Sequence, residues 1–295
     1  MLNAHDADII ANLFYALDTS VRYELYKGFI ADERDYTSAL ASNFRHPYGI
    51  FNTYGIAGLK LKAKWLAKVN DGSYEQKFGC DSMIVFQVGD EVKVCLFEAK
   101  WPRVIKNPKY NWDSLQKSSK VSHFTDQIRR QSEWAGEAAI WEMFYYEEKV
   151  GEIGKVFDAY GSTCVKYEFA RDYLDGPDSP LSIWDNDDLT RLIVSSHSGS
   201  FDGQTESNLR AMVSEVLQCK FGAPIPMGIY GTGFNLTSTT GDSVQIPAFD
   251  LDDLSERNGI IGEFMGTSGL DFFQWITVER DDSDQGVVSS DSGGF

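Results

Sequence analysis

The chain has 295 residues, of which 42% are apolar and 14% aromatic, so it can bury a core and is not a disordered protein. No apolar run is long enough to cross a bilayer, and no positive charge precedes the apolar residues near the N-terminus, so we expect a cytoplasmic protein without a membrane partner. The four Cys and four His are scattered, which argues against a zinc site or a disulfide framework and leaves oxygen ligands for any metal.

The net charge of −17 is unevenly distributed along the chain. Residues 1–170 carry 21 Lys and Arg against 23 Asp and Glu, a net of −2, whereas residues 171–295 carry 6 against 21, a net of −15. Between residues 99 and 130 the sign reverses, with eight basic against two acidic side chains. The acidity, which opposes phosphate binding, therefore belongs to the C-terminal part. On charge alone, the basic stretch over residues 99–130 is best interpreted as a solvated helix face.

The N-terminal residues predict two helices and a strand. Apolar residues recur at helical spacing over 6–28, and a second helix is expected over 31–47, where a proline closes it. Over 59–66 the apolar residues alternate with three lysines, which predicts a strand with one wet, basic face.

A β-hairpin is the clearest local feature of the sequence. The apolar run 82–88 predicts a buried strand, Gly89-Asp90 a tight turn, and 91–100 the partner strand. A helix over 122–138 and an aromatic-rich strand over 139–147 follow. The order helix, strand, hairpin, helix, strand predicts an α/β fold with a mixed central β-sheet flanked by helices.

Beyond residue 150 the signals are shorter. They predict a strand over 162–170, helices over 186–196 and 205–221, and irregular or β structure from 222 onward. We therefore expect three parts: a core over 1–150, an acidic α+β accessory region over 151–280 that supplies substrate or partner contacts, and a disordered acidic tail over 281–295.

Three charged side chains of the hairpin carry the chemistry. Asp81 stands at the start of the first strand, and Glu98 and Lys100 stand near the end of the second, so antiparallel pairing brings them together. Residues two apart on a strand share a face. Two carboxylates at one rim of a sheet are costly unless a cation holds them, so Asp81 and Glu98 are the candidate ligands of Mg²⁺, or of Mn²⁺, with the carbonyl of Ala99 as a third ligand. Lys100 would orient the attacking water and offset charge on the phosphate.

The pattern Gly-Cys-Asp81, hairpin, Glu98-Ala-Lys100 resembles the PD-(D/E)xK, or restriction-endonuclease-like, nuclease superfamily, with cysteine where the family often has proline. The resemblance covers roughly residues 25–147 and implies a restriction-endonuclease-like core. It also implies Mg²⁺-dependent cleavage of DNA, by an enzyme of the restriction or phage-defence type.

The resemblance implies two further site residues. Relatives often carry an additional acid on the first core helix, a role that falls on Glu33. Relatives also place a glutamine facing the site on the helix after the hairpin, and Gln127 and Gln131 occupy that helix. The alternative for Glu33 is an acid that favours a helix start, and for the glutamines ordinary polar positions on a helix.

Other interpretations of the chain stay open. Asp81 and Glu98 are surface carboxylates in the simplest alternative, with Lys100 as an ion-pair partner. The rival function is a catalytically inactive nuclease fold that serves as a binding or assembly module, whose acidic C-terminal region engages a protein partner or mimics DNA. An RNA-cutting enzyme would share the same site. The sequence does not determine the oligomeric state; a homodimer is one candidate assembly, since many such nucleases cut two strands as dimers.

Overall fold

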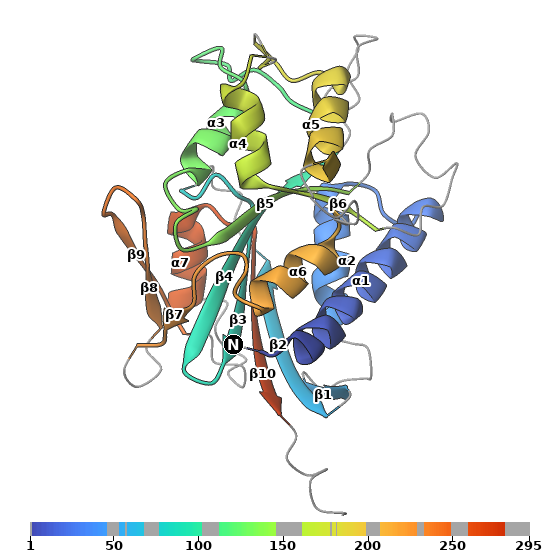
Figure 1. Cartoon of the computed structure of the whole chain (residues 1–295), viewed down its shortest axis with the longest axis vertical. Coiled ribbons are helices and arrows are strands. Elements are labelled where there is room, and N and C mark those ends of the chain that lie inside the picture. Colours follow the sequence, from blue (N-terminus) through green and yellow to red (C-terminus); the bar gives the residue numbers. More distant parts are fainter. Residues whose placement is uncertain are drawn as a thin grey trace, which may run out of the picture.

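The computed structural model describes residues 2–45, 53–56, 58–67, 77–101, 112–145, 161–177, 179–180, 182–198, 207–228, 233–248 and 259–280. These residues form an α/β fold around an eight-stranded mixed sheet, as the sequence predicted. The strand order is β1-β2-β10-β3-β4-β5-β6, and β7 pairs with β4 beside this path. Helices cover both faces of the sheet (Figure 1). None of the described helices is both long and apolar enough to cross a membrane.

Two helices open the chain, close to the predicted bounds: α1 (Ala4–Tyr26) and α2 (Glu33–Arg45). The side chain of Asn3 caps α1 by accepting a hydrogen bond from the backbone N–H of Asp6. The apolar face of α1 is buried, and α1 packs against both α2 and the later helix α6 (Leu209–Leu217). The three helices lie together on one side of the sheet (Figure 1).

The predicted hairpin is present. Strand β3 (Ser82–Val88) pairs antiparallel with β4 (Glu91–Lys100), and Val88 faces Glu91 across the turn. Gly89 adopts φ 59° there, a conformation that favours glycine. Strand β2 (Leu59–Ala67) also matches its prediction and pairs with β1 (Thr53–Ile56).

The next crossover places a helix between two parallel strands. Helix α3 (His123–Gln131) leads from β4 to β5 (Ala139–Phe144), which runs parallel to β4. The helix is shorter than the predicted 122–138, because residues 132–137 form turns that carry the buried side chain of Trp134 into the core. Arg129 and Arg130 occupy the last turn of α3, where positive charge is favourable.

The strand predicted over 162–170 is half strand and half helix. Strand β6 (Thr163–Lys166) pairs antiparallel with β5, and α4 (Tyr167–Asp175) begins directly after it. Tyr167 and Ala170 are buried at helical spacing, so the apolar residues after β6 follow a helix rather than a strand. The predicted helices further on correspond to α5 (Asn186–Ser198) and α6.

The C-terminal segment contributes a central strand to the same sheet. Strand β10 (Phe272–Arg280) lies between β2 and β3, antiparallel to the first and parallel to the second. It is buried on both faces at its first five residues, which suits a central position. The sheet therefore draws strands from both sides of the boundary expected at residue 150.

The rest of the region after residue 222 is partly β, as expected, and partly helical. The strands are β7 (Ile225–Pro226), β8 (Phe234–Thr237) and β9 (Ser243–Ile246), of which β8 and β9 form a separate hairpin. Helix α7 (Ile260–Ser268) was not predicted; it ends at Gly269, which adopts the left-handed conformation of a helix C-terminus. The tail 281–295 lies outside the described residues.

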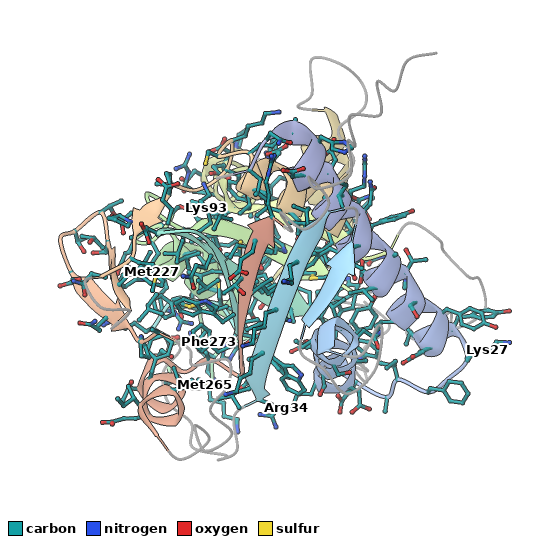
Figure 2. The ribbon with its side chains drawn as sticks, turned by 90° about the horizontal axis from the view of Figure 1, so that it is seen from below. Lys27, Arg34, Lys93, Met227, Met265 and Phe273 are labelled. Carbon is teal, nitrogen blue, oxygen red and sulfur yellow. The ribbon has the colours of Figure 1, made fainter. Side chains whose placement is uncertain are left out.

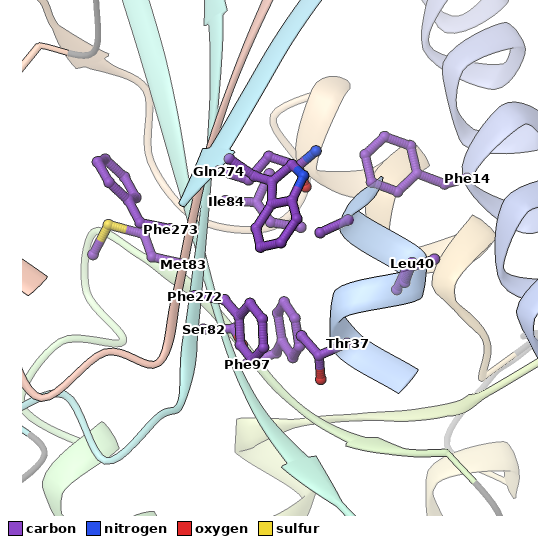
Figure 3. A pocket seen from close by; sticks show the side chains of 12 residues that line it. Phe14, Thr37, Leu40, Ser82, Met83, Ile84, Phe97, Phe272, Phe273 and Gln274 are labelled. Carbon is purple, nitrogen blue, oxygen red and sulfur yellow. The ribbon is translucent and has the colours of Figure 1, made fainter. Parts of the chain in front are cut away.

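The sheet separates two hydrophobic cores. The α1-side core contains the buried apolar residues of α1, α2 and α6, and the α3-side core contains those of α3, α4, α5 and α7. Met265 of α7 and Phe273 of β10 lie on the α3 side, whereas Lys27 and Arg34 lie on the side of α1 and α2 (Figure 2). Side chains alternate between the cores along each strand: Met83 and Phe273 point away from α2, and Ile84 and Gln274 point toward it (Figure 3).

Candidate functional site

The hairpin brings its three charged residues to one end of the sheet. Asp81 directly precedes β3, and Glu98 and Lys100 end β4. Ser82 pairs with Phe97, so the start of β3 lies beside the end of β4. Phe97 belongs to the α1-side core, and the alternation therefore directs Glu98 and Lys100 to the α3 side.

Lys100 is held by two hydrogen bonds in a nearly dry environment. Its ammonium group donates to Glu98 Oε1 at 3.0 Å and to Gln127 Oε1 at 2.7 Å, and only 6% of the residue is exposed. The ammonium also lies 4.7 Å from the centroid of the Phe124 ring. Two buried acceptors and an aromatic face keep this amine charged and fix its direction.

Helix α3 supplies the glutamine that binds both Lys100 and Glu98. Gln127 is buried; its carbonyl oxygen accepts from Lys100, and its amide nitrogen donates to Glu98 Oε1. The structure thus places Gln127 at the site, where the resemblance expected a glutamine. Gln131 lies one turn further on and donates to the carbonyl oxygen of Gly79 at 2.9 Å instead.

Gly79 lets α3 approach the hairpin closely. It adopts φ 66°, and a Cβ there would lie 2.5 Å from the carbonyl oxygen of Gln127. A side chain at this position would push α3 away from the strand ends. The glycine two residues before Asp81 is therefore part of what aligns Gln127 with Glu98.

A second glutamate, which was not among the predicted site residues, lies beside Glu98. Glu142 of β5 is the register partner of Glu98 in the parallel pairing of β4 and β5, so both side chains leave the same face of the sheet. Glu142 is fully buried. Among the described residues, neither of its carboxylate oxygens nor Glu98 Oε2 meets a donor at full hydrogen-bond geometry. The side chain of Gln131 nevertheless lies within hydrogen-bonding reach of Glu142, and that of Asp81 within reach of Glu98. The signal that could have identified Glu142 is a lone charge inside the apolar strand Ala-Ile-Trp-Glu-Met-Phe.

The electrostatics of the site are those of crowded carboxylates around one ammonium group. Burial raises the pKa of Asp81 well above its ordinary value, and the charge of Glu98 adds to the rise. Burial raises the pKa of Glu98 to about 7; Lys100 opposes the rise, and Glu142 adds to it. The pKa of Glu142 is also raised by burial, to about 7, although Lys100 and the nearby Gln131 oppose the rise. Burial alone would lower the pKa of Lys100, but its carboxylate neighbours raise it.

Glu33 lies at the same end of the sheet but belongs to α2, on the other face. It is half-buried at the start of the helix, and its charge contributes to the raised pKa of Glu98. The Thr37 hydroxyl donates to the Glu33 carbonyl oxygen at 3.0 Å and contacts the hydroxyl of Tyr145, just after β5. The structure therefore places Glu33 close enough to the site for its charge to act on Glu98.

Strand β10, whose place in the central sheet was not predicted, brings another acid to this rim. Asp271 directly precedes β10, and its backbone N–H donates to the carbonyl oxygen of Asp81 at 2.7 Å. Its carboxylate lies 3.5 Å from the guanidinium of Arg34 on α2. Asp271 also raises the pKa of Asp81. No local signal pointed to Asp271, because its position depends on a strand contributed from the far end of the chain.

Ala99 lies between the two charged residues of β4, and its side chain packs in the α1-side core. In the part of the chain that the structure describes, no group of three or more His, Cys, Asp and Glu side chains has the geometry of a metal site. Mg²⁺ is commonly bound by one or two carboxylates together with waters and substrate oxygens, so a protein site of this kind need not contain three such side chains.

On the other face of the sheet, a pocket opens between α2 and the strands (Figure 3). Its lining is almost entirely apolar and includes Phe97, Phe272 and Leu40. The buried Ser82 Oγ and Gln274 Nε2 line the same pocket and have no hydrogen-bond partner among the described residues. The charged groups of β4 point away from this pocket, so it is separate from the carboxylate site.

No protein-family model, curated protein or solved structure matches the chain. Part of the basic stretch predicted to follow the hairpin, residues 102–111, lies outside the described residues.

Proposed function

We propose that the chain is an Mg²⁺-dependent phosphodiesterase that cleaves DNA, with a core of the restriction-endonuclease-like type. The observation that carries the proposal is the buried ammonium group of Lys100, hydrogen-bonded to Glu98 and Gln127 beside the acid Asp81. Phosphodiester hydrolysis needs this combination of a fixed positive charge and carboxylates that can hold a divalent cation.

The donor set suits Mg²⁺. Asp81 and Glu98 would hold the ion, with the carbonyl of Ala99 as a further oxygen ligand, and the buried Glu98 Oε2 meets no donor at full hydrogen-bond geometry among the described residues. A bound divalent cation would polarise the scissile phosphate and make an attacking water more acidic. Burial and the neighbouring charge of Glu98 disfavour the ionised form of Asp81 when no cation is present, so these carboxylates are arranged for a positive charge.

The protein's own groups supply position and charge. Lys100 stays protonated because its carboxylate neighbours raise its pKa, so its ammonium can orient a water and offset the negative charge that develops on the phosphate. Gln127 binds both Lys100 and Glu98 and fixes their separation. The nearly dry surroundings strengthen each of these interactions.

Two features of the fold support a nucleic-acid substrate. The order α2, β1, β2, β3, β4, α3, β5, with β4 parallel to β5, resembles the expected nuclease core apart from the extra edge strand β1 and the insertion of β10 between β2 and β3. Lys60, Lys62 and Lys64 alternate with residues of the α1-side core and therefore lie on the same face of the sheet as Glu98. A row of lysines on that face suits a phosphate backbone.

The direct test is incubation of plasmid and linear DNA with the protein, with and without Mg²⁺. The wild type is expected to cleave only with the metal, and Glu98→Ala and Lys100→Ala to lose cleavage while keeping the far-ultraviolet circular dichroism spectrum. Glu91→Ala is the matched control, since Glu91 is exposed at the opposite end of β4. Cleavage by Glu98→Ala would contradict the assignment, and cleavage of RNA but not DNA would contradict the substrate.

A further inference from the structure

We propose that the pocket between α2 and the sheet binds a small uncharged aromatic compound that carries one hydrogen-bond acceptor. The pocket is separate from the carboxylate site, so the inference goes beyond the proposed function and does not depend on it. The observation behind it is an almost entirely apolar pocket with two buried polar side chains in its lining. Ser82 Oγ and Gln274 Nε2 have no hydrogen-bond partner among the described residues.

The pairing of β3 with β10 brings the two polar side chains to the same side of the pocket. Phe272 is the register partner of Ser82, and Gln274 lies two residues further along β10, on the same face of the sheet. Ser82 is 1% exposed and Gln274 is 5% exposed. The side chain of Gln274 points from the sheet toward α2, into the space that the pocket occupies (Figure 3).

The remaining lining determines what kind of molecule fits. None of the described residues that line the pocket is charged, and several are aromatic, among them Phe14, Phe97 and Phe272. The empty space is about 350 Å³, open mouth included, which is at the small end of the range of ligand pockets. Aromatic side chains pack favourably against a flat ring, and an apolar lining disfavours a charged ligand. A neutral compound of about one ring therefore suits this pocket.

The two polar groups indicate where the ligand carries its oxygen. The amide nitrogen of Gln274 is a donor only, and the hydroxyl of Ser82 can donate or accept. A carbonyl oxygen on the ligand can accept from both. A buried donor without an acceptor destabilises a fold, and an apolar residue would pack in this lining at lower cost. Binding of a ligand gives the glutamine a function that offsets this cost.

The competing interpretation is that ordered water fills the pocket and pairs with both side chains. A buried water typically makes about three hydrogen bonds. Thr37, another hydroxyl of the lining, already donates to the carbonyl oxygen of Glu33, so it does not donate to a water. The two interpretations differ in sign: Gln274→Leu lowers the melting temperature if water satisfies the amide, and raises the melting temperature of the ligand-free protein if the amide lacks a partner.

The experiment compares the wild type with Gln274→Leu, Leu40→Trp and the control Gln245→Leu. Leu40 lines the pocket from α2, so a tryptophan there fills the space, whereas Gln245 is exposed on β9. Each protein is titrated by calorimetry with acetophenone, which has one ring and one carbonyl oxygen. Parallel titrations use ethylbenzene, which lacks the oxygen, and benzoate, which is charged. Melting temperatures are measured without ligand.

We expect the wild type to bind acetophenone saturably, with a dissociation constant below about 1 mM. Its affinity for ethylbenzene should be about 10-fold weaker, and benzoate should not bind. Gln274→Leu should lose the preference for acetophenone and melt at a higher temperature than the wild type. Leu40→Trp should bind neither compound, and Gln245→Leu should match the wild type. Gln274→Leu keeps the test valid if Leu40→Trp does not fold.

Absence of saturable acetophenone binding by the wild type would overturn the inference. So would equal affinity for acetophenone and ethylbenzene, unchanged acetophenone binding by a folded Leu40→Trp, or a lower melting temperature of Gln274→Leu. The titrations contain neither metal nor DNA, so a protein that binds acetophenone in this way and cleaves no DNA would retain the pocket as a ligand site and lose only the nuclease function.

Discussion

Replacement of Gln127 by leucine tests whether the hydrogen bonds around Lys100 hold the site together. Leucine keeps the helix and the approximate volume but cannot bind either charged neighbour. Gln127→Leu removes the hydrogen bond from Lys100 at 2.7 Å and the bond to Glu98. A hydrogen bond to a charged group contributes about 1.5–3 kcal/mol, so the loss of both should lower the free energy of unfolding by about 3–6 kcal/mol.

Gln131→Leu is the matched control, because it is also a buried glutamine of α3, one turn away. It loses the bond to the Gly79 carbonyl, a neutral pair that contributes about 0.5–1.5 kcal/mol, and the interaction with Glu142 that opposes the rise in that group's pKa. Both hydrogen bonds of Lys100 stay in place in this variant. The assay is urea unfolding monitored by circular dichroism, with DNA cleavage measured in parallel. Equal destabilisation by the two variants would refute the reasoning, as would full cleavage activity in Gln127→Leu.

Three further predictions concern other parts of the molecule. Burial raises the pKa of Asp18, so its stabilising contribution should be complete below the ordinary carboxylate pKa and decline as pH rises through the raised value. Melting temperatures from pH 4 to 8 should therefore fall less steeply in Asp18→Asn than in the wild type, and the slope that remains in the variant belongs to Glu98 and Glu142, whose pKa values are also raised; an equal slope in both proteins would contradict this. Gly79→Ala should lower the free energy of unfolding by about 1–3 kcal/mol in urea, because φ 66° and the Gln127 carbonyl oxygen both oppose a Cβ; a neutral effect would contradict the close approach of α3. Lys60→Ala should weaken DNA binding and reduce the slope of log affinity against log salt by about 1, whereas an unchanged slope would remove Lys60 from the DNA-binding surface.

The parts of the site that could be predicted from the sequence are those set by local structure. Strands β3 and β4 are joined by a two-residue turn, so their register, and with it the proximity of Asp81 to Glu98, follows from the apolar pattern and the glycine. The position of Gln127 came from the resemblance rather than from spacing. The carboxylates were treated as strand-end groups, but Glu98 is 4% exposed, so the site is drier than the sequence suggested.

The parts that could not be predicted depend on pairings between distant segments. Glu142 lies next to Glu98 only because β5 is parallel to β4 after a crossover, and Asp271 lies next to Asp81 only because β10 enters between β2 and β3. The apolar run Phe-Phe-Gln-Trp-Ile-Thr-Val indicates a buried strand, but nothing local determines its neighbours. Glycines at both ends and within Ile260–Ser268 obscured α7, whose helical form depends on its packing in the α3-side core.

The most direct test of the central claim is an anomalous difference map from a crystal of the protein soaked in Mn²⁺. We expect a peak in contact with the carboxylate oxygens of Asp81 and Glu98, at about 2.1 Å as for a hard cation with oxygen ligands, on the α3 side of the sheet. A peak elsewhere, or carboxylates that turn away from one another with no ion between them, would contradict it.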